Sequence, residues 1–244
     1  MDYINKIPRT IHYCWFGGKE KPWLVKKCIE SWQQHLPHYE ILEWNENNFN
    51  ININPYMKEA YNAGKYAFVS DYVRVYALYN YGGIYLDTDV EVFKPFDDLL
   101  HHNSFWGFEQ ENYIATSTIG AEKGNALIKE FLDSYKEKKF IKEDGTFNQL
   151  TNVVTITRLL EEKGLRQNGH LQEINEFGVF YPQTYFSPYD YINCQTFITD
   201  KTYTIHHFYK SWLPIRKRIK GKVKFILSKL IGGHNIARLR RIYR

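Results

Sequence analysis

The chain has 244 residues, 43% of them hydrophobic and 24% charged, which allows one large or two small packed domains and excludes a disordered chain. Of its 32 basic residues, 13 lie from Lys201 onward, where no acidic residue occurs, so residues 1–200 carry 19 basic and 27 acidic side chains. The acidic body argues against a nucleic-acid-binding protein, while the basic tail concerns partners rather than the fold.

Apolar periodicity, interrupted by glycine and proline, predicts strands that alternate with helices through the first half of the chain. Strands are predicted at residues 10–16, 39–44, 84–86, 90–93, 105–108, 114–119, 178–181 and 203–207. Helices are predicted at residues 23–34, 55–63, 66–81, 125–138 and 148–163. This alternation favours an α/β sheet of the nucleotide-binding type.

The predicted strand 84–86 is followed by two carboxylates, Asp87 and Asp89, with only a threonine between them. Unpaired charge at the end of a buried strand is costly, so a cation is expected there. If the strand continues, residues i and i+2 face the same side, and both carboxylates can bind one hard divalent cation such as Mg²⁺ or Mn²⁺. The alternative, a solvated turn capped by Asp87, stays open from this motif alone.

The preceding predicted helix, YAFVSDYVRVYALYNY, is apolar or aromatic almost all round, and Asp71 and Arg74 are its only charges. The two residues are three positions apart and therefore lie on one helix face. Because such a helix must be buried, two interpretations remain. Either the pair is an internal ion pair, or Asp71 accepts from a sugar hydroxyl while Arg74 donates to sugar or phosphate.

Ser70-Asp71-x-x-Arg74 followed by YGGIYLDTD resembles the glycosyltransferases of family thirty-two, the sugar-binding DXD family of bacterial capsular and surface-polysaccharide loci. The same segments are similar to the glucosyltransferase domains of the large clostridial toxins, and IPRTIHYCWFGG resembles the family's first nucleotide-binding strand. The similarity covers about residues 7–100, with a later patch at 206–212, whereas residues 109–202 match only loosely. It implies a GT-A fold, a Rossmann-like mixed sheet flanked by helices, over residues 1–213.

The resemblance also implies roles for individual residues. Trp15 would stack on the nucleotide base, although a tryptophan at a strand end can equally belong to the core. Asp87 would lie near the sugar and ribose, and Asp89 would be the direct metal ligand. Donor-binding residues are implied at Trp15, Ser70, Asp87, Ser211 and Trp212, catalytic ones at Asp71, Arg74 and Asp87, and metal ligands at Asp87 and Asp89.

His206 and His207 end a predicted strand, TYTIHH, in which alternation places one side chain inward and one outward. In related metal-dependent transferases a late histidine or acidic residue completes the metal shell, so either histidine is a candidate ligand, and a structural histidine is the alternative. Ser211 and Trp212 resemble the family's flexible C-terminal element that closes over the diphosphate, with a spacing that departs from the toxins.

The implied reaction transfers a hexose from a nucleotide diphosphate sugar, by family habit a UDP-sugar, to a hydroxyl of a glycan or lipid-linked glycan. The resemblance further implies Mn²⁺ or Mg²⁺ as cofactor, retention of anomeric configuration and a role in capsular or surface-polysaccharide synthesis. Retention by double displacement needs a carboxylate nucleophile, for which the sequence offers no clear candidate, whereas a front-face reaction needs none. The alternatives are a non-catalytic sugar-nucleotide-binding domain and a nucleic-acid binder acting through the tail.

The tail, residues 214–244, has apolar residues at spacings of three to four among many Lys and Arg. This pattern predicts one or two basic amphipathic helices at an anionic membrane surface, with packing on the domain as the alternative. The sequence has no apolar stretch of about 18 residues and no secretory signal at its start. Because Cys14, Cys28 and Cys194 are widely spaced, we expect reduced thiols and a cytoplasmic protein, with peripheral binding to the inner membrane face.

Overall fold

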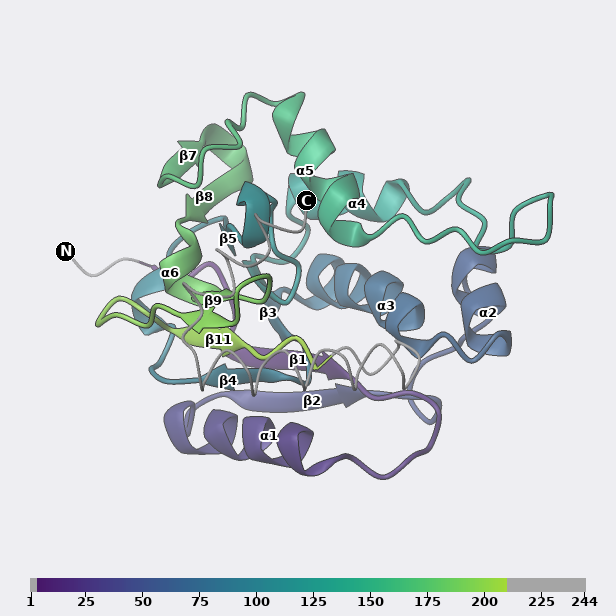
Figure 1. The fold of residues 1–244 in the computed structure, drawn as a ribbon, viewed down its shortest axis with the longest axis horizontal. Helices are drawn as coiled ribbons and strands as arrows, with labels where there is room; N and C mark the ends of the chain where they lie inside the picture. The colour runs from purple at the N-terminus through teal and green to yellow at the C-terminus, as the bar shows by residue number, and fades with distance from the viewer. Residues whose placement is uncertain (1–3, 210–244) are drawn as a thin grey trace, which may run out of the picture.

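A seven-stranded mixed sheet forms the centre of the computed structural model, which describes residues 4–209 (Figure 1). In sheet order the strands are β2 (Glu40–Trp44), β1 (Thr10–Cys14), β3 (Gly83–Leu86), β6 (Thr118–Ala121), β5 (Ser104–Gly107), β8 (Gly178–Tyr181) and β7 (Gln172–Ile174). Strand β1 pairs in parallel with β2 and β3, and β5 with β8, whereas β6 runs antiparallel between β3 and β5 and β7 runs antiparallel to β8. The expected α/β fold class, a mixed sheet flanked by helices, is confirmed.

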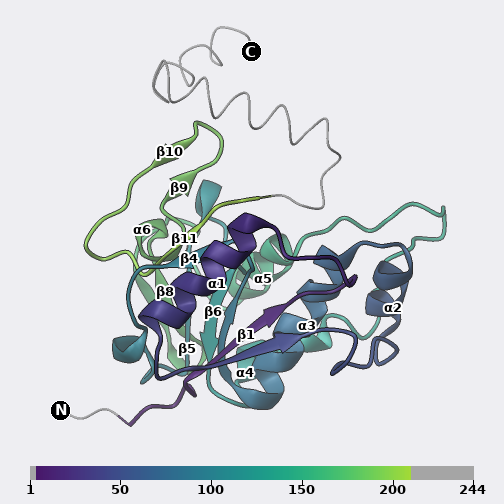
Figure 2. The ribbon, with the colours of Figure 1, turned by 90° about the horizontal axis from the view of Figure 1, so that it is seen from below.

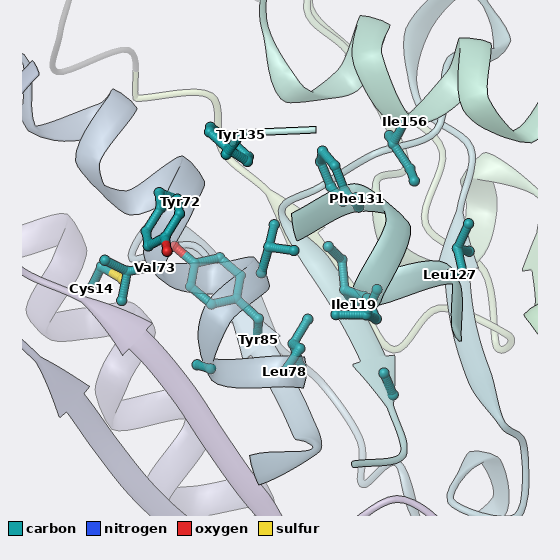
Figure 3. Close-up of a cluster of buried hydrophobic side chains, with 14 of the residues drawn as sticks. Cys14, Tyr72, Val73, Leu78, Tyr85, Ile119, Leu127, Phe131, Tyr135 and Ile156 are labelled. Atoms are coloured by element: carbon teal, nitrogen blue, oxygen red, sulfur yellow. The ribbon is translucent and has the colours of Figure 1, made fainter. Parts of the chain in front are cut away.

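Helices cover both faces of the sheet because successive strand residues point to opposite sides. Helix α1 (Trp23–His35) covers one face of the sheet (Figures 1 and 2). In β3, Ile84 and Leu86 pack in the cluster that contains α1, and Tyr85 packs in the other cluster. That second cluster is built with α2 (Pro55–Asn62), α3 (Tyr66–Tyr81), α4 (Ala126–Asp133) and α5 (Asn152–Glu161). Figure 3 shows Tyr85, Leu78, Ile119 and Phe131 within it. Helix α3 is thereby fixed against the centre of the sheet.

Short elements complete the described chain. Strands β4 (Val90–Val92) and β11 (Thr204–His206) form an antiparallel pair, in which His206 lies opposite Val90. The other short elements are α6 (Gln183–Phe186), the antiparallel pair β9 (Tyr189–Asp190) and β10 (Gln195–Thr196), and 3₁₀ turns at Asp97–Leu99, Gln110–Asn112 and Asn175–Phe177. The β4–β11 pair brings a late segment of the chain to the carboxyl end of β3.

Several predicted boundaries differ from the structure: the helix predicted at residues 125–138 ends at Asp133, and two elements begin four residues later than predicted. The helix predicted from residue 148 begins at Asn152, because the Asn148 side chain accepts a hydrogen bond from the Leu150 N–H (3.2 Å) in a local turn that competes with the helix. The strand predicted from residue 114 begins at Thr118, because the Ile114 N–H donates to Thr157 Oγ1 (2.9 Å). The two- and three-residue strands β7, β9 and β10 were not predicted, since runs this short carry no periodicity.

The predictions for the C-terminal segment lie outside the described residues. They concern Ser211, Trp212, the boundary near Pro214 and the amphipathic tail. Within residues 4–209, no helix combines the length and the apolar character needed to cross a membrane.

Candidate active site

The turn between β3 and β4 carries the two carboxylates of the D-x-D motif. Strand β3 ends at Leu86, and Asp87–Asp89 form a tight turn in which the Val90 N–H donates to the Asp87 carbonyl (3.0 Å). The strand therefore does not continue through the motif, and the argument from alternation on an extended segment does not apply. The turn itself brings the two side chains together, while the Asp87 N–H is held by the Ser117 carbonyl (2.8 Å).

Two glycines set the path from helix α3 into this strand. Gly82 ends α3 with φ 68° and Gly83 starts β3 with φ 103°, both in the left-handed region. A Cβ on Gly83 would lie 2.6 Å from the Thr10 carbonyl oxygen, and one on Gly82 would lie 2.7 Å from the Lys123 nitrogen. Since neither backbone atom can move away cheaply, this connection requires glycine at both positions. It aligns the polar face of α3 with the start of the D-x-D turn.

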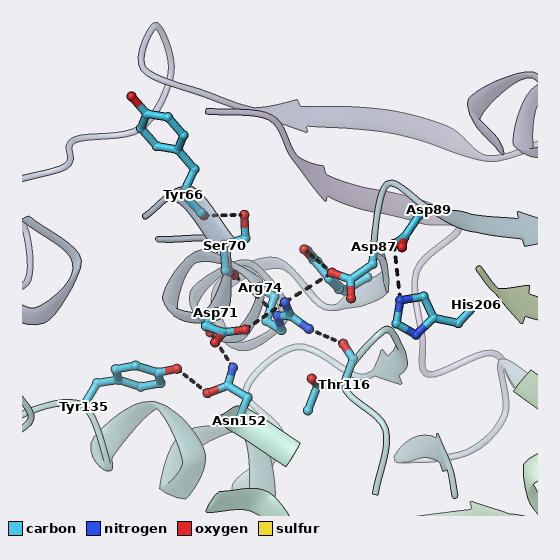
Figure 4. A network of polar contacts seen from close by, with 11 residues as sticks. Tyr66, Ser70, Asp71, Arg74, Asp87, Asp89, Thr116, Tyr135, Asn152 and His206 are labelled. Carbon is cyan, nitrogen blue, oxygen red and sulfur yellow. Dashed lines mark hydrogen bonds and ion pairs between the residues drawn. The ribbon is translucent and has the colours of Figure 1, made fainter. Parts of the chain in front are cut away.

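Arg74 on helix α3 joins two carboxylates that come from different elements. Its guanidinium lies 2.9 Å from the Asp71 carboxylate and 3.2 Å from the Asp87 carboxylate, and donates to the Thr116 carbonyl (2.5 Å) (Figure 4). The side chain is 5% exposed. Burial lowers the pKa of Arg74, but Asp87 and the other neighbouring groups outweigh this effect and the pKa is raised. The two interpretations of the Asp71–Arg74 pair are therefore not exclusive, because the ion pair exists and lines the cavity described below.

Asp71 is the most perturbed acid of this network. Burial, the largest cause, raises its pKa to about 6. The positive charges of Arg74 and Lys138 oppose this rise, and the negative charge of Asp87 adds to it. Its backbone carbonyl accepts from Asn152 Nδ2 (2.9 Å), which fixes the N-terminus of α5 beside it (Figure 4). A carboxyl group with a pKa near neutrality in a polar cavity is typical of a functional site.

The raised pKa of Asp71 predicts a pH-dependent stability. Because folding raises the pKa from its ordinary value of 3.8, the contribution of Asp71 to stability is fully present below about pH 4 and is lost as pH rises to 6. We expect the free energy of unfolding of the wild-type chain to fall by up to about 1.4 kcal/mol per pH unit in this window. The comparison is with Asp71→Asn, which cannot ionise. Thermal unfolding of both proteins from pH 4 to 7 measures the difference. A difference that stays constant over this range would contradict the assignment.

Asp89 lies against His206, which is positioned by the pairing of β11 with β4. The distance from His206 Nε2 to the Asp89 carboxylate is 3.3 Å (Figure 4). Burial favours the neutral acid, but the charge and hydrogen bond of His206 prevail and lower the pKa of Asp89 to about 2. For His206, burial lowers the pKa and Asp89 raises it, and the net result is a raised pKa. Each group of the pair therefore favours the charged form of the other.

Among the described residues, Asp87, Asp89 and His206 form a group that can hold a metal ion. One ligand atom from each lies within 4.8 Å of the others. His206 Nδ1 is buried and has no hydrogen-bond partner within residues 4–209, so neither nitrogen of the ring is committed to a structural bond other than that to Asp89. Two carboxylates and an imidazole suit Mn²⁺ and also Mg²⁺, with remaining positions open to water and phosphate oxygens.

His207 points to a different cluster. Its Nε2 lies 2.9 Å from the Glu91 carboxylate, which also accepts from Lys27 Nζ (2.9 Å) on helix α1. The alternation expected for the two histidines is therefore present, and the structure brings His206, but not His207, to the D-x-D carboxylates. The His207–Glu91–Lys27 contacts instead tie β11 and β4 to α1.

The other donor-binding candidates lie on the wall of one cavity of about 540 Å³. Trp15 follows β1, is partly buried and donates from Nε1 to the Lys19 carbonyl (2.6 Å). Ser70 donates to the Tyr66 carbonyl (3.1 Å) along α3. The candidates lining this cavity are Trp15, Ser70, Asp71, Arg74, Asp87, Asp89 and His206. The structure thus gathers every candidate within the described residues except His207.

Several cavity residues were not predicted from the sequence. Glu109, Thr116 and Ser117 line it from the segment between β5 and β6, and Asn152 does so from the start of α5. All four lie in the part of the chain that resembles the family only loosely. Glu109 could have been noticed as a carboxylate directly after the predicted strand 105–108, whereas nothing in the local sequence marks the other three.

Comparison with known families identifies the segment that carries most of this site. Residues 22–106 match the family described as the glycosyltransferase sugar-binding region containing the DXD motif. The match covers about a third of the chain and shows a likeness to this family in that segment. The matched glycosyltransferase region contains Asp71, Arg74 and both D-x-D carboxylates, while Trp15 precedes it and His206 lies beyond its end.

Individual proteins that resemble this chain are distant. Inositol phosphoceramide mannosyltransferase 3 of Schizosaccharomyces pombe is 30% identical over 129 residues, 50% of this chain and 35% of the relative. An uncharacterized glycosyltransferase of Acanthamoeba polyphaga mimivirus is 26% identical over 223 residues, 88% of this chain and 87% of the relative. The solved PaToxG glycosyltransferase is 19% identical with a TM-score of 0.47, covering 66% of this chain and 71% of that one. The chain spans about a third of the length of the mannosyltransferase.

Proposed function

We propose that the protein is a metal-dependent, retaining glycosyltransferase that moves a hexose from a nucleotide diphosphate sugar to a glycan hydroxyl. One observation carries the proposal. The Asp71–Arg74 pair, the D-x-D carboxylates and His206 converge on one cavity, and most of them lie in the segment that matches the DXD glycosyltransferase family. A UDP-sugar donor and a role in capsular or surface-polysaccharide synthesis extend the proposal and rest on the resemblance described above.

The residues of the cavity divide the work between them. Asp87, Asp89 and His206 would hold Mn²⁺ or Mg²⁺, which when bound offsets the negative charge of the leaving nucleotide diphosphate. Asp71, ionised above its raised pKa, would accept a hydrogen bond from a donor-sugar hydroxyl. Arg74, already shared between Asp71 and Asp87, would orient both carboxylates rather than bind the sugar alone. Such fixed charges need no reorganisation during the reaction.

Bond changes at the sugar follow from the donor chemistry. The bond from the anomeric carbon to the diphosphate oxygen breaks, a bond to the acceptor oxygen forms, and the acceptor proton passes to the departing diphosphate in a front-face reaction. Double displacement would instead require a carboxylate at the anomeric carbon. The described cavity offers Asp71, held by Arg74, and Glu109 as further carboxylates, so trapping of a glycosyl-enzyme intermediate distinguishes the two routes.

A screen of nucleotide sugars tests the proposed function. The full chain is incubated with Mn²⁺ and each donor, and release of the free sugar and nucleotide diphosphate is measured, since water can replace the acceptor. We expect hydrolysis of one donor class that stops when the metal is chelated. Donor binding without hydrolysis or transfer would instead support the non-catalytic sugar-nucleotide-binding domain. Binding of the tail to an anionic membrane surface, and a cytoplasmic location, remain predictions from the sequence.

Trp15 provides a test of the nucleotide end of the cavity. Trp15→Ala is expected to weaken binding of the free nucleotide diphosphate by about 1–3 kcal/mol, the loss typical of one base stacked on an aromatic ring. Isothermal titration calorimetry on the folded variant measures this change. Trp23→Ala is the matched control, because Trp23 is 75% exposed and does not line the cavity. Unchanged nucleotide affinity in Trp15→Ala would show that Trp15 does not stack on the base and only packs in the protein.

A further inference from the structure

The segment that follows β11 wraps around Asp89. The His207 N–H donates to the Asp89 carbonyl (3.0 Å), and the Tyr209 N–H donates to the Asp89 carboxylate (2.7 Å). His206 Nε2 lies 3.3 Å from the same carboxylate. Residues on both sides of position 208 therefore contact Asp89. That position is Phe208, which also lines the cavity.

Phe208 adopts a backbone conformation that its side chain disfavours. Its φ of 49° lies in the left-handed region, which is uncommon for a bulky residue and persists only where the surroundings enforce it. This residue lies between His207 and Tyr209, whose backbone N–H groups both donate to Asp89. Strain of this kind next to a candidate metal ligand points to a role beyond simple packing.

The Phe208 ring is clamped between the candidate ligand and the β9–β10 hairpin. Its centroid lies 3.9 Å from that of the His206 imidazole, with the planes inclined at 31°. On the hairpin side it lies 4.8 Å from the ring of Tyr191 and 6.1 Å from that of Tyr189. Figure 2 shows this hairpin beside the end of β11. The ring thus covers one face of the imidazole.

This arrangement replaces a contact that metal-binding histidines normally have. In most metal sites the second ring nitrogen of the histidine donates to a carboxylate, carbonyl or water, which fixes the ring. His206 Nδ1 is buried and lacks such a partner within the described part of the chain. We propose that Phe208 is a positioning residue that holds the His206 ring and the Asp89 carboxylate in metal-binding geometry, because it packs on the imidazole face where no hydrogen bond to Nδ1 fixes the ring. This inference rests on the proposed metal dependence.

Direct titration of the full chain with Mn²⁺, without nucleotide, tests the role of Phe208. Phe208→Met keeps the volume but loses the flat ring, Phe208→Gly accepts the left-handed backbone conformation but loses the side chain, and Phe208→Tyr keeps the ring. We expect the first two variants to raise the Kd for Mn²⁺ about tenfold or more, as loss of an outer-sphere partner does, and Phe208→Tyr to bind like the wild type. Phe147→Leu is the control, because this partly exposed aromatic stacks on Phe140 and does not line the cavity.

Two further readouts separate positioning from general packing. A purely structural role would lower the melting temperature of Phe208→Met without changing its Kd for Mn²⁺. The ¹⁵N signals of the His206 imidazole, recorded without metal, should shift in Phe208→Met and Phe208→Gly, because the ring stacked on it is gone. Wild-type affinity in these two variants would overturn the inference while leaving the metal site intact, provided that Asp89→Asn still abolishes binding. If the wild-type chain itself binds no Mn²⁺, the proposed metal dependence fails as well.

Discussion

Asp89→Ala is expected to reduce metal-dependent donor hydrolysis by about 10³-fold, since a metal ion on the leaving group supplies several kcal/mol of transition-state stabilisation. Asp89 accepts from the Tyr209 N–H and lies against His206, so alanine removes structural contacts as well as a metal ligand. Asp89→Asn is therefore the sharper variant, because it keeps an acceptor oxygen and removes the charge. Both variants are compared by hydrolysis rate at saturating Mn²⁺ and by calorimetric Kd for Mn²⁺.

The control for Asp89 is Asp97→Asn. Asp97 forms an exposed pair with Arg9 at 2.6 Å and does not line the cavity, so its loss should leave the hydrolysis rate unchanged. Near wild-type turnover of Asp89→Asn in the presence of a chelator would show that the reaction needs no metal at this position. An unchanged Kd for Mn²⁺ in the same variant would show that residues other than Asp89 bind the metal.

Arg74→Ala should affect both stability and activity. The guanidinium is almost fully buried and lies between Asp71 and Asp87, so its removal leaves two carboxylates without their counter-ion. Breaking a buried ion pair in this way costs about 3–5 kcal/mol, which corresponds to a fall in melting temperature of about 6–20 °C for a domain of this size. We also expect kcat/KM for donor hydrolysis to fall by at least about 10²-fold, because the two carboxylates lose their common anchor.

Arg74→Lys distinguishes charge from geometry. Lysine keeps the positive charge but lacks the planar fork that reaches two carboxylates and a carbonyl at once. We expect it to recover part of the lost melting temperature and little of the lost kcat/KM, measured on the same samples. Full activity in Arg74→Lys would show that a point charge is enough. An unchanged melting temperature and activity in Arg74→Ala would show that Arg74 has no role in the site.

The sequence predicted the local elements best where one strong signal decided them. Helix α3 has the predicted limits Tyr66–Tyr81, because a nearly continuous apolar run meets two glycines that no other residue can replace. The proximity of Asp71 to Arg74 followed from helix geometry, and the opposite directions of His206 and His207 followed from strand alternation. These features depend only on residues close together in the chain.

The remaining features depend on contacts between distant residues, which the sequence does not display. The choice of His206 over His207 required the register of β11 against β4. The bond between Arg74 and Thr116 and the placement of Phe208 against Tyr191 required the folded structure. The D-x-D motif shows the same limit, because the sequence suggested an extended strand where the chain forms a turn.

The pairing of β4 with β11 also bears on how the protein is made. Asp87 and Asp89 leave the ribosome long before residues 204–206. While the first part of the sheet folds, Asp87 can already pair with Arg74, whereas the His206 partner of Asp89 is still missing. Closing this long loop is entropically unfavourable until the late strand docks. The third candidate ligand is therefore the last to arrive. A chain interrupted before residue 204 would contain β3 and the D-x-D turn but would lack the third candidate ligand. The candidate metal site therefore depends on a pairing between two strands that lie more than 100 residues apart in the sequence.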